Sequence, residues 1–270
     1  LSKFFLKRFS KSSEYNGRKS INCHYWDIKE QSCKKKNPKN ISTKSYLFSS
    51  ISIENWEYDH QLEEKYASNE NEVASVLRDF LDKRKELDPK SQKILIDFFS
   101  LYLFRSMSPK IQDKLSKLLP EGESNIEKII YDQAKAYAHN SLVDIQKGLL
   151  LLVEDIWNKI KDKNWSFYHI NNDEKSFVTS DCPIYFYPDL WLNNPDLKIV
   201  FTLGSKLVWI IHWKWKERSN KDIENNALID KINYKTIANA TELIIWDNED
   251  LVCWLVKNRN KYPTNLFVEL

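Results

Sequence analysis

The sequence predicts an α+β fold in which a helical middle layer packs against a mostly antiparallel β-sheet. Apolar residues recur every three to four positions between Tyr58 and about Lys161, which is the period of amphipathic helices. The segments on both sides hold short β-branched and aromatic runs that are typical of strands. No repeat or low-complexity linker interrupts the chain. We therefore expect a single domain with a basic β segment (1–56), a helical part (57–163) and a mostly β part (164–270).

The amino-terminal segment is basic. Residues 1–44 hold 12 Lys/Arg and 3 Asp/Glu, although the net charge of the whole chain is only +3. Ser20–Ile28 alternates polar and apolar residues and is expected to form a strand. The segment "SYLFSSIS" (Ser45–Ser52) could pair with it across the loop "CKKKNPKN". The lysines either approach phosphate backbones or form a solvated loop, and both interpretations are open.

Helix signals follow one another through the middle of the chain. Tyr58–Lys85 is an amphipathic helix by its spacing. Asp88-Pro89 supplies an N-cap and a proline for the helix "SQKILIDFFSLYLFRS", which is apolar on nearly every side and should be buried. Ser108-Pro109 repeats this signal for a shorter helix. The capping box of Ser124 and Glu127 starts a long helix that ends near Lys161.

The last third alternates strands with shorter helices. The runs "WSFYHI", "SFVTS", "IYFY", "KIVFTL" and "KLVWIIHWKW" are strand-like, and Gly204-Ser205 is the candidate hairpin turn between the last two. A helix near Asp222–Asn233, the strand "TELIIW", a helix over Glu249–Lys257 and the strand "NLFVEL" complete the prediction. Alternate residues of "KLVWIIHWKW", among them three tryptophans, share one face, which is either core or a surface on which bases stack.

The cysteine pattern and the apolar runs indicate a cytoplasmic protein. The four cysteines form no CxxC pair and no secretory segment is visible, so reduced thiols are expected. The longest apolar run, Gly148–Val153, is far too short to span a bilayer, and no membrane role is expected.

No motif of a large enzyme class is present: the sequence lacks a P-loop, GxSxG, HExxH, GxGxxG and zinc-spaced cysteines. The best candidate is Asp181 in "SFVTSDCPIYFYP", where Ser180-Asp181 ends an apolar run. Asp181 either bonds its own backbone in an Asx-turn or offers a carboxylate at a strand end.

The spacing after Asp181 allows a metal site. Fourteen residues separate it from Asp196-Leu197-Lys198, which resembles the metal-binding core of PD-(D/E)xK nucleases. There Asp181 and Asp196 would hold Mg²⁺, and Lys198 would orient the attacking water. Asp173-x-Lys175 and Glu63-x-Lys65 match the same short string, so the pattern is not specific.

Arg105 is the candidate for anion binding. It lies late in the apolar central helix, where it must form an ion pair, for instance with Glu63 or Glu70, or reach a polar cleft and clamp a phosphate. Lys7 and Arg8 would join it if the amino terminus folds back over the helices. The histidines His24 and His212 are structural residues or acid–base groups, and both roles are open.

Several stretches resemble one family. "FFLKRFS", "LEEKYASNENEVASVLRDF", "FRSMSP", "FVTSDCPI", "IVFTLGSKLVWII" and "NALIDKINYKTIANATELII" occur in the order found in the bacterial DUF4238 family, which has no established biochemical function. The resemblance implies a bacterial or phage cytosolic protein and supplies no chemistry. Members usually carry a His-x-Val-Pro-like element before "FxLKRF"; this sequence starts inside that element, and either the histidine precedes Leu1 or this member lacks it.

Two functional hypotheses follow. The first is a protein that binds or cleaves nucleic acid, in its enzymatic form a Mg²⁺-dependent nuclease effector of a toxin or defence system, with Ser180 and Arg105 binding the substrate. The second is a non-catalytic module that binds a protein partner, in which Asp181 only shapes its turn.

Overall fold

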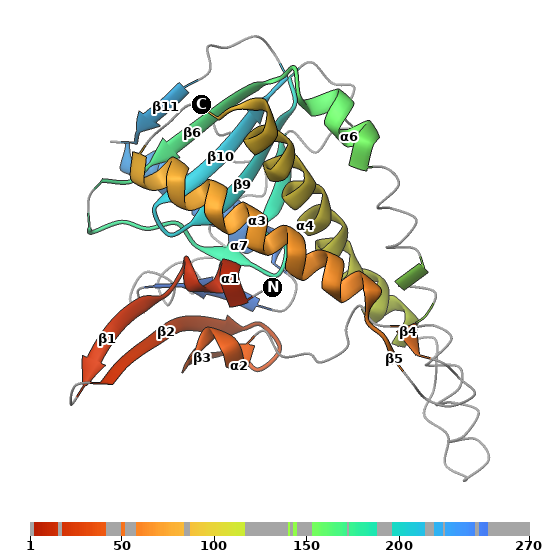
Figure 1. Ribbon diagram of the computed structural model, residues 1–270. Helices are drawn as coiled ribbons and strands as arrows, with labels where there is room; N and C mark the ends of the chain where they lie inside the picture. Colours follow the sequence, from red (N-terminus) through yellow and green to blue (C-terminus); the bar gives the residue numbers. More distant parts are fainter. Residues whose placement is uncertain are drawn as a thin grey trace. The chain divides into compact units, whose positions relative to one another are not determined.

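A computed structural model confirms the α+β class: the described residues form helices and mostly antiparallel sheets (Figure 1). The chain divides into two compact units, residues 1–43 with 162–270 and residues 44–161. The structure describes residues 3–15, 18–41, 50–51, 58–83, 87–116, 140, 143–144, 153–171, 173–187, 196–213, 219–223, 225–240 and 243–247.

The first unit contains two five-stranded sheets. One joins strands from both ends of the chain in the order β1-β2-β12-β7, with β3 also paired to β2 and every pair antiparallel. Its members are β1 (Lys11–Tyr15), β2 (Arg18–Asp27), β3 (Ser32–Lys36), β7 (Thr179–Ser180) and β12 (Leu243–Trp246). The strand expected over Ser20–Ile28 is thus confirmed as the main part of β2.

The lysine run that the sequence predicts as a loop is the strand β3. The Asp27 side chain accepts hydrogen bonds from the backbone N–H groups of Lys29 and Glu30, both at 3.0 Å. Gln31 then takes a positive φ of 49°, which completes a tight turn. This turn returns the chain along β2, and β3 leaves its outer edge to solvent among the described strands, a position that lysines suit well.

The second sheet of this unit has the order β11-β6-β10-β9-β8, in which only the pairing of β11 with β6 is parallel. Its members are β6 (Asn164–His169), β8 (Ile184–Tyr187), β9 (Lys198–Gly204), β10 (Leu207–His212) and β11 (Ser219–Asp222). Trp209 is fully buried and stacks on Phe167, so this tryptophan belongs to the core.

The hairpin turn between β9 and β10 lies one residue later than predicted. Gly204 pairs with Leu207, so Ser205 and Lys206 form the turn. Gly204 is needed for a different reason. A Cβ at this position would lie 3.2 Å from Nε and from Nη2 of Arg8, which is closer than most Cβ contacts.

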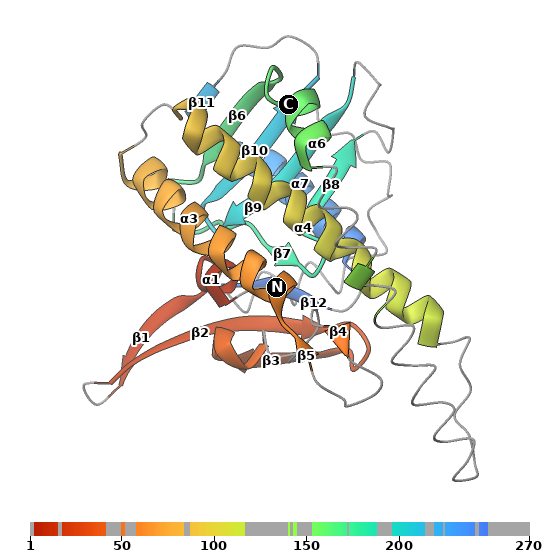
Figure 2. The ribbon, with the colours of Figure 1, turned by 45° about the vertical axis from the view of Figure 1, so that its right-hand side comes forward.

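The helix α7 (Asn226–Asn239) packs on both sheets (Figures 1 and 2). It starts later than the predicted Asp222 because the side chain of Asn225 accepts from the first backbone N–H groups and fixes the N-cap there. Ile229 and Ile232 contact the second sheet, and farther along the helix Ile237 packs in a cluster with residues of β12. The short helices α1 (Lys3–Lys7) and α2 (Pro38–Ile41) lie in the same unit.

The described residues of the second unit are mainly helical. Its elements are β4 (Ser50–Ile51), β5 (Tyr58–Asp59), α3 (Gln61–Lys83), α4 (Pro89–Ser116) and α6 (Val153–Ile160). α4 contacts both α3 and α6. Asp88 caps α4 as predicted, because its Oδ1 accepts a hydrogen bond from the Ser91 N–H at 2.8 Å. Hydrogen bonds from Ser91 also lower the pKa of Asp88.

One prediction for this unit is wrong and another is tested only in part. Of the segment Ser45–Ser52, predicted to pair with the strand over Ser20–Ile28, the structure describes only β4, and β4 pairs with β5. The helix α4 continues through Ser108-Pro109 to Ser116. A proline inside a helix removes one backbone hydrogen bond and its ring crowds the preceding turn, yet α4 continues past Pro109.

Several predicted elements lie outside the described residues: most of the helix from Ser124 onwards, the helix over Glu249–Lys257 and the strand "NLFVEL". The helix ending near Lys161 is confirmed for its last part by α6. Within the described part of the chain, no helix is long and apolar enough to cross a membrane.

Candidate functional site

The segment that precedes Asp181 is held by the buried amide of Asn233 on α7. The Asn233 Oδ1 accepts from the Val178 N–H at 3.0 Å, and its Nδ2 donates to the Ser176 carbonyl at 2.9 Å. The hydroxyl of Ser176 donates to Asp247 at 2.7 Å. These groups are all buried. The amide therefore replaces a β-strand partner for a stretch that pairs with no strand among the described elements.

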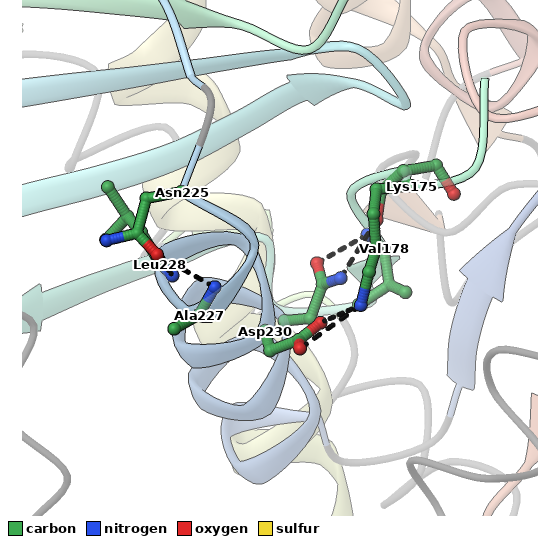
Figure 3. Close-up of polar contacts among 8 residues, drawn as sticks. Lys175, Val178, Asn225, Ala227, Leu228 and Asp230 are labelled. Atoms are coloured by element: carbon green, nitrogen blue, oxygen red, sulfur yellow. Dashed lines mark hydrogen bonds and ion pairs between the residues drawn. The ribbon is translucent and has the colours of Figure 1, made fainter. Parts of the chain in front are cut away.

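An ion pair between Lys175 and Asp230 also ties the segment before Asp181 to α7 (Figure 3). The Nζ of Lys175 lies 2.9 Å from Oδ1 of Asp230 on α7, one turn before the buried amide. Figure 3 also shows the Asn225 cap at the start of this helix. Sequence reasoning missed Asn233, although a polar residue among the apolar positions of "NALIDKINYKTIAN" is a usable signal for a buried hydrogen-bonding side chain.

Asp181 lies just after β7, and its carboxylate bonds to the neighbouring strand. Its N–H donates to the carbonyl of Leu243 at 3.2 Å, and its Oδ1 accepts from the Leu243 N–H at 3.3 Å. The predicted Asx-turn bond is made instead by Ser180, whose Oγ accepts from the Cys182 N–H at 3.1 Å. Ser180 is fully buried, so its side chain serves the turn.

The residues that follow Asp181 are also tied to α7. The Nδ2 of Asn239 donates to the carbonyls of Cys182 and Ile184, both at 3.0 Å. The Sγ of Cys182 lies 3.9 Å from Oδ2 of Asp181. Each carboxylate oxygen of Asp181 therefore has a contact within the protein.

Lys198 and Asp196 lie at the other end of β8. Ile184 pairs with Phe201 and Tyr187 pairs with Lys198, so Lys198 is three strand steps, or ~10 Å, beyond the Ile184 end. Asp181 precedes Ile184, whereas Asp196 precedes Lys198.

This register separates Asp181 from the other two residues of the nuclease-like pattern. Ligands of one Mg²⁺ each lie ~2 Å from it, so the ladder offers no common magnesium site for Asp181 and Asp196. Among the described residues, no three His, Cys, Asp or Glu side chains gather as a group that could hold a metal ion.

Of the residues predicted to bind an anion, Lys7 and Arg8 lie on or directly after α1, and Arg105 lies on α4. Arg8 is half-buried: its Nε donates to the Leu203 carbonyl, and its own carbonyl accepts from the Ser205 N–H at 3.0 Å. It therefore joins the first helix to the β9–β10 hairpin. Lys7 is exposed. Arg105 lies on α4 in the second unit, and its side chain is outside the described residues.

Both candidate histidines lie on strands of the first unit. His212 is buried at the end of β10, opposite Lys198. His24 is on β2, and its ring stacks on Trp246 with the centroids 6.3 Å apart. Burial raises the pKa of the nearby Cys23 thiol to about 11, which keeps it protonated and unreactive at neutral pH.

Exposed lysines are spread over several neighbouring elements of the first unit. Exposed lysines stand on or beside α1, β1, β2, β3 and α2; they are Lys7, Lys11, Lys29, Lys35, Lys36 and Lys39. Lys34 pairs with Glu30, which raises the pKa of that lysine. The Nζ of Lys36 lies 5.6 Å from the centre of the Tyr25 ring. We call the six exposed lysines the lysine surface.

Comparison with known proteins places the chain in a family without adding an activity. No curated protein and no solved structure matches the chain significantly. The model of DUF4238, described as a protein of unknown function, matches residues 1–250. This match covers most of the sequence, and the chain therefore belongs to the DUF4238 family.

Proposed function

We propose that this protein binds nucleic acid through the lysine surface. The supporting observation is that six exposed lysines stand on or beside ordered strands and helices of one unit, and not on one long solvated loop. Lysines held in this way neutralise phosphates and release their counterions, which supplies most of the free energy of sequence-independent binding.

The surroundings of these lysines support binding to a phosphate backbone. The segment over residues 1–44 carries four times as many basic as acidic residues, 12 against 3. One of the three acids, Asp27, is engaged in its turn, and another, Glu30, pairs with Lys34. The segment therefore keeps a large excess of positive charge over its own carboxylates.

Binding is better supported than cleavage. Asp181 bonds to the Leu243 N–H, and the strand register carries Asp196 and Lys198 to the opposite end of β8. These residues do not fit a shared Mg²⁺, and no catalytic step is assigned to them. The proposal therefore gives the protein a nucleic-acid partner and leaves out a nuclease reaction.

The proposed setting is the bacterial cytoplasm, with a role in a toxin or defence system. The thiols of Cys23, Cys33 and Cys182 form no disulfide, as is usual for a reducing compartment. The bacterial setting and the defence role are drawn from the family resemblance.

Fluorescence anisotropy with labelled 20-nucleotide single-stranded DNA, single-stranded RNA and duplex DNA tests the proposal. The double variant Lys35→Glu/Lys36→Glu reverses two charges of the lysine surface. The matched control Lys65→Glu/Lys221→Glu makes the same change in net charge at exposed lysines on α3 and β11.

We expect micromolar or tighter binding at low salt for the wild type and at least tenfold weaker binding for Lys35→Glu/Lys36→Glu. The salt dependence of the binding constant should also fall by about two counterions, at ~0.9 per phosphate contact. Equal losses in both double variants would show that net charge alone attracts the nucleic acid. No binding by the wild type to any of the three probes would refute the proposal.

A further inference from the structure

The strands β1 and β2 form a two-stranded ribbon beyond the rest of their sheet. Residues 18–22 of β2 pair only with β1 among the described strands, whereas residues 23–27 pair with β3 and residues 24–27 also pair with β12. Figures 1 and 2 both show β1 and the start of β2 continuing past β3 and α2. The ribbon is five residue pairs long, from Lys11 opposite Asn22 to Tyr15 opposite Arg18.

The half of this ribbon nearer the rest of the sheet carries side chains that can read the edges of nucleic-acid bases. The exposed Lys11 faces the partly exposed Asn22, whose Nδ2 donates to the hydroxyl of Ser20 at 2.7 Å. On the other face Ser12 is exposed opposite Ile21. Ile21 is 37% exposed and is the one large hydrophobic residue that is exposed in the described part of the chain.

This combination has the chemistry of a groove-reading element. Lysine donates to guanine O6 and N7, asparagine forms paired hydrogen bonds with adenine, and an apolar side chain contacts the thymine methyl group. An exposed isoleucine gains nothing from phosphate contacts alone. Its placement between polar residues is explained if both faces of the ribbon meet a surface with donors, acceptors and methyl groups.

We propose that the β1–β2 ribbon enters the major groove of duplex B-DNA while the lysine surface contacts the adjoining phosphates. This inference rests on the proposed nucleic-acid binding and adds the substrate class. The major groove is ~12 Å wide and admits a two-stranded β-ribbon. Five residue pairs extend over ~17 Å, the length of about five base pairs.

Duplex RNA should bind less well than duplex DNA of the same sequence. The major groove of A-form RNA is deep and too narrow for side chains to read. Single strands offer no groove at all. The ribbon should therefore produce a preference for duplex DNA that the lysine surface by itself does not give.

The experiment compares two double variants of equal composition in the full chain. Lys11→Ala/Asn22→Ala removes one lysine and one asparagine from the ribbon, and Lys65→Ala/Asn71→Ala removes the same pair from α3, where both residues are exposed and neither belongs to the lysine surface. Binding to a 20-base-pair DNA duplex, the matching RNA duplex and the single strands is measured by anisotropy. Circular dichroism verifies that each variant is folded. Protection of guanine N7 from dimethyl sulfate reports occupation of the major groove.

We expect the wild type to prefer duplex DNA over duplex RNA by at least fivefold and to protect guanine N7. The ribbon variant should lose about tenfold in affinity for duplex DNA and lose the protection, whereas the α3 variant changes affinity by less than threefold and keeps it. Ile21→Glu provides a second test on the opposite face and should also abolish the protection.

The failures of the two proposals are distinguishable. If the wild type binds but leaves guanine N7 reactive, or if the ribbon and α3 variants behave alike, the ribbon does not enter the groove and the lysine surface alone carries binding. If the wild type binds none of the probes, the proposed function and this inference are both refuted.

Discussion

Replacement of Asn233 by alanine tests whether one amide holds the segment before Asp181. The side chain is fully buried and forms two hydrogen bonds, at 3.0 Å from the Val178 N–H and at 2.9 Å to the Ser176 carbonyl. With alanine at this position, the Val178 N–H and the Ser176 carbonyl stay buried and lose their hydrogen bonds to the amide. The structure shows no neighbouring strand along this stretch that could replace it among the described elements.

Each orphaned buried backbone group costs ~1–3 kcal/mol, so Asn233→Ala should lower the free energy of unfolding by about 2–5 kcal/mol. In a chain of this size that loss corresponds to about 5–15 °C in Tm. Thermal unfolding followed by intrinsic fluorescence suits the measurement. Buried Trp209 and Trp246 lie in the same unit, and their emission reports its opening.

Asn226→Ala is the matched control. Asn226 is exposed in the first turn of the same helix, so its replacement should change stability by less than ~0.5 kcal/mol. If the Tm of Asn233→Ala lies within about 2 °C of the Tm of this control, the two hydrogen bonds of the amide do not stabilise the segment before Asp181, and the reasoning is refuted.

Three further predictions concern single side chains. Asp181→Ala should cost about 1 kcal/mol because the Leu243 N–H loses its acceptor, whereas Asp181→Asn keeps an acceptor and should cost less; urea unfolding compares them. Gly204→Ala should lower Tm by a few degrees, since the new methyl group would press on Arg8 at 3.2 Å, and an unchanged Tm would show that the arginine moves freely. Burial raises the pKa of Tyr185, so unfolding releases a proton above pH ~10 and stability falls as the pH rises. Tyr185→Phe should therefore lose less stability than the wild type between about pH 9 and pH 11 in urea titrations.

Local chemistry makes some elements predictable. The start of α4 follows from Asp88 and Pro89 because the cap is made by residues within three positions of each other. The strands of the second sheet follow from their β-branched and aromatic composition, since a half-buried or buried strand favours those side chains. Both kinds of signal act over a few residues and are visible in a single sequence.

The strand β3 shows where local composition misleads. Three consecutive lysines are disfavoured in a buried strand, so composition alone predicts a loop for this run. An edge strand of this kind meets water on one side, so charge is tolerated there and prevents unwanted pairing. The turn after Asp27 is visible in the sequence, but the lysine run is predicted as a strand only when its position at the edge of the sheet is known.

The candidate site depends on contacts that no local pattern reveals. Asp181 meets Leu243 across 62 positions, and Asn233 meets Ser176 across 57. The spacing of Asp181 and Asp196 is compatible with a metal site until the register of β8 with β9 is known. Strand register is a property of the whole sheet, which explains why the magnesium hypothesis can be stated but not judged from the sequence.

Three of the six stretches by which the chain resembles its family meet at one turn of the fold. Phe5 and Phe201, from "FFLKRFS" and "IVFTLGSKLVWII", lie 5.8 Å apart between ring centroids. Ser205 donates its N–H to the Arg8 carbonyl at 3.0 Å, and its own carbonyl accepts from the N–H of Phe177, in "SFVTSDCPI", at 2.8 Å. One turn thus joins three sequence motifs through backbone bonds and aromatic packing. Phe5 and Phe201 are buried at this junction, so these two side chains contribute to folding, whatever reaction or ligand a member of the family serves. These three motifs therefore report the fold, and the proposed function is assigned instead to the lysine surface of the same unit.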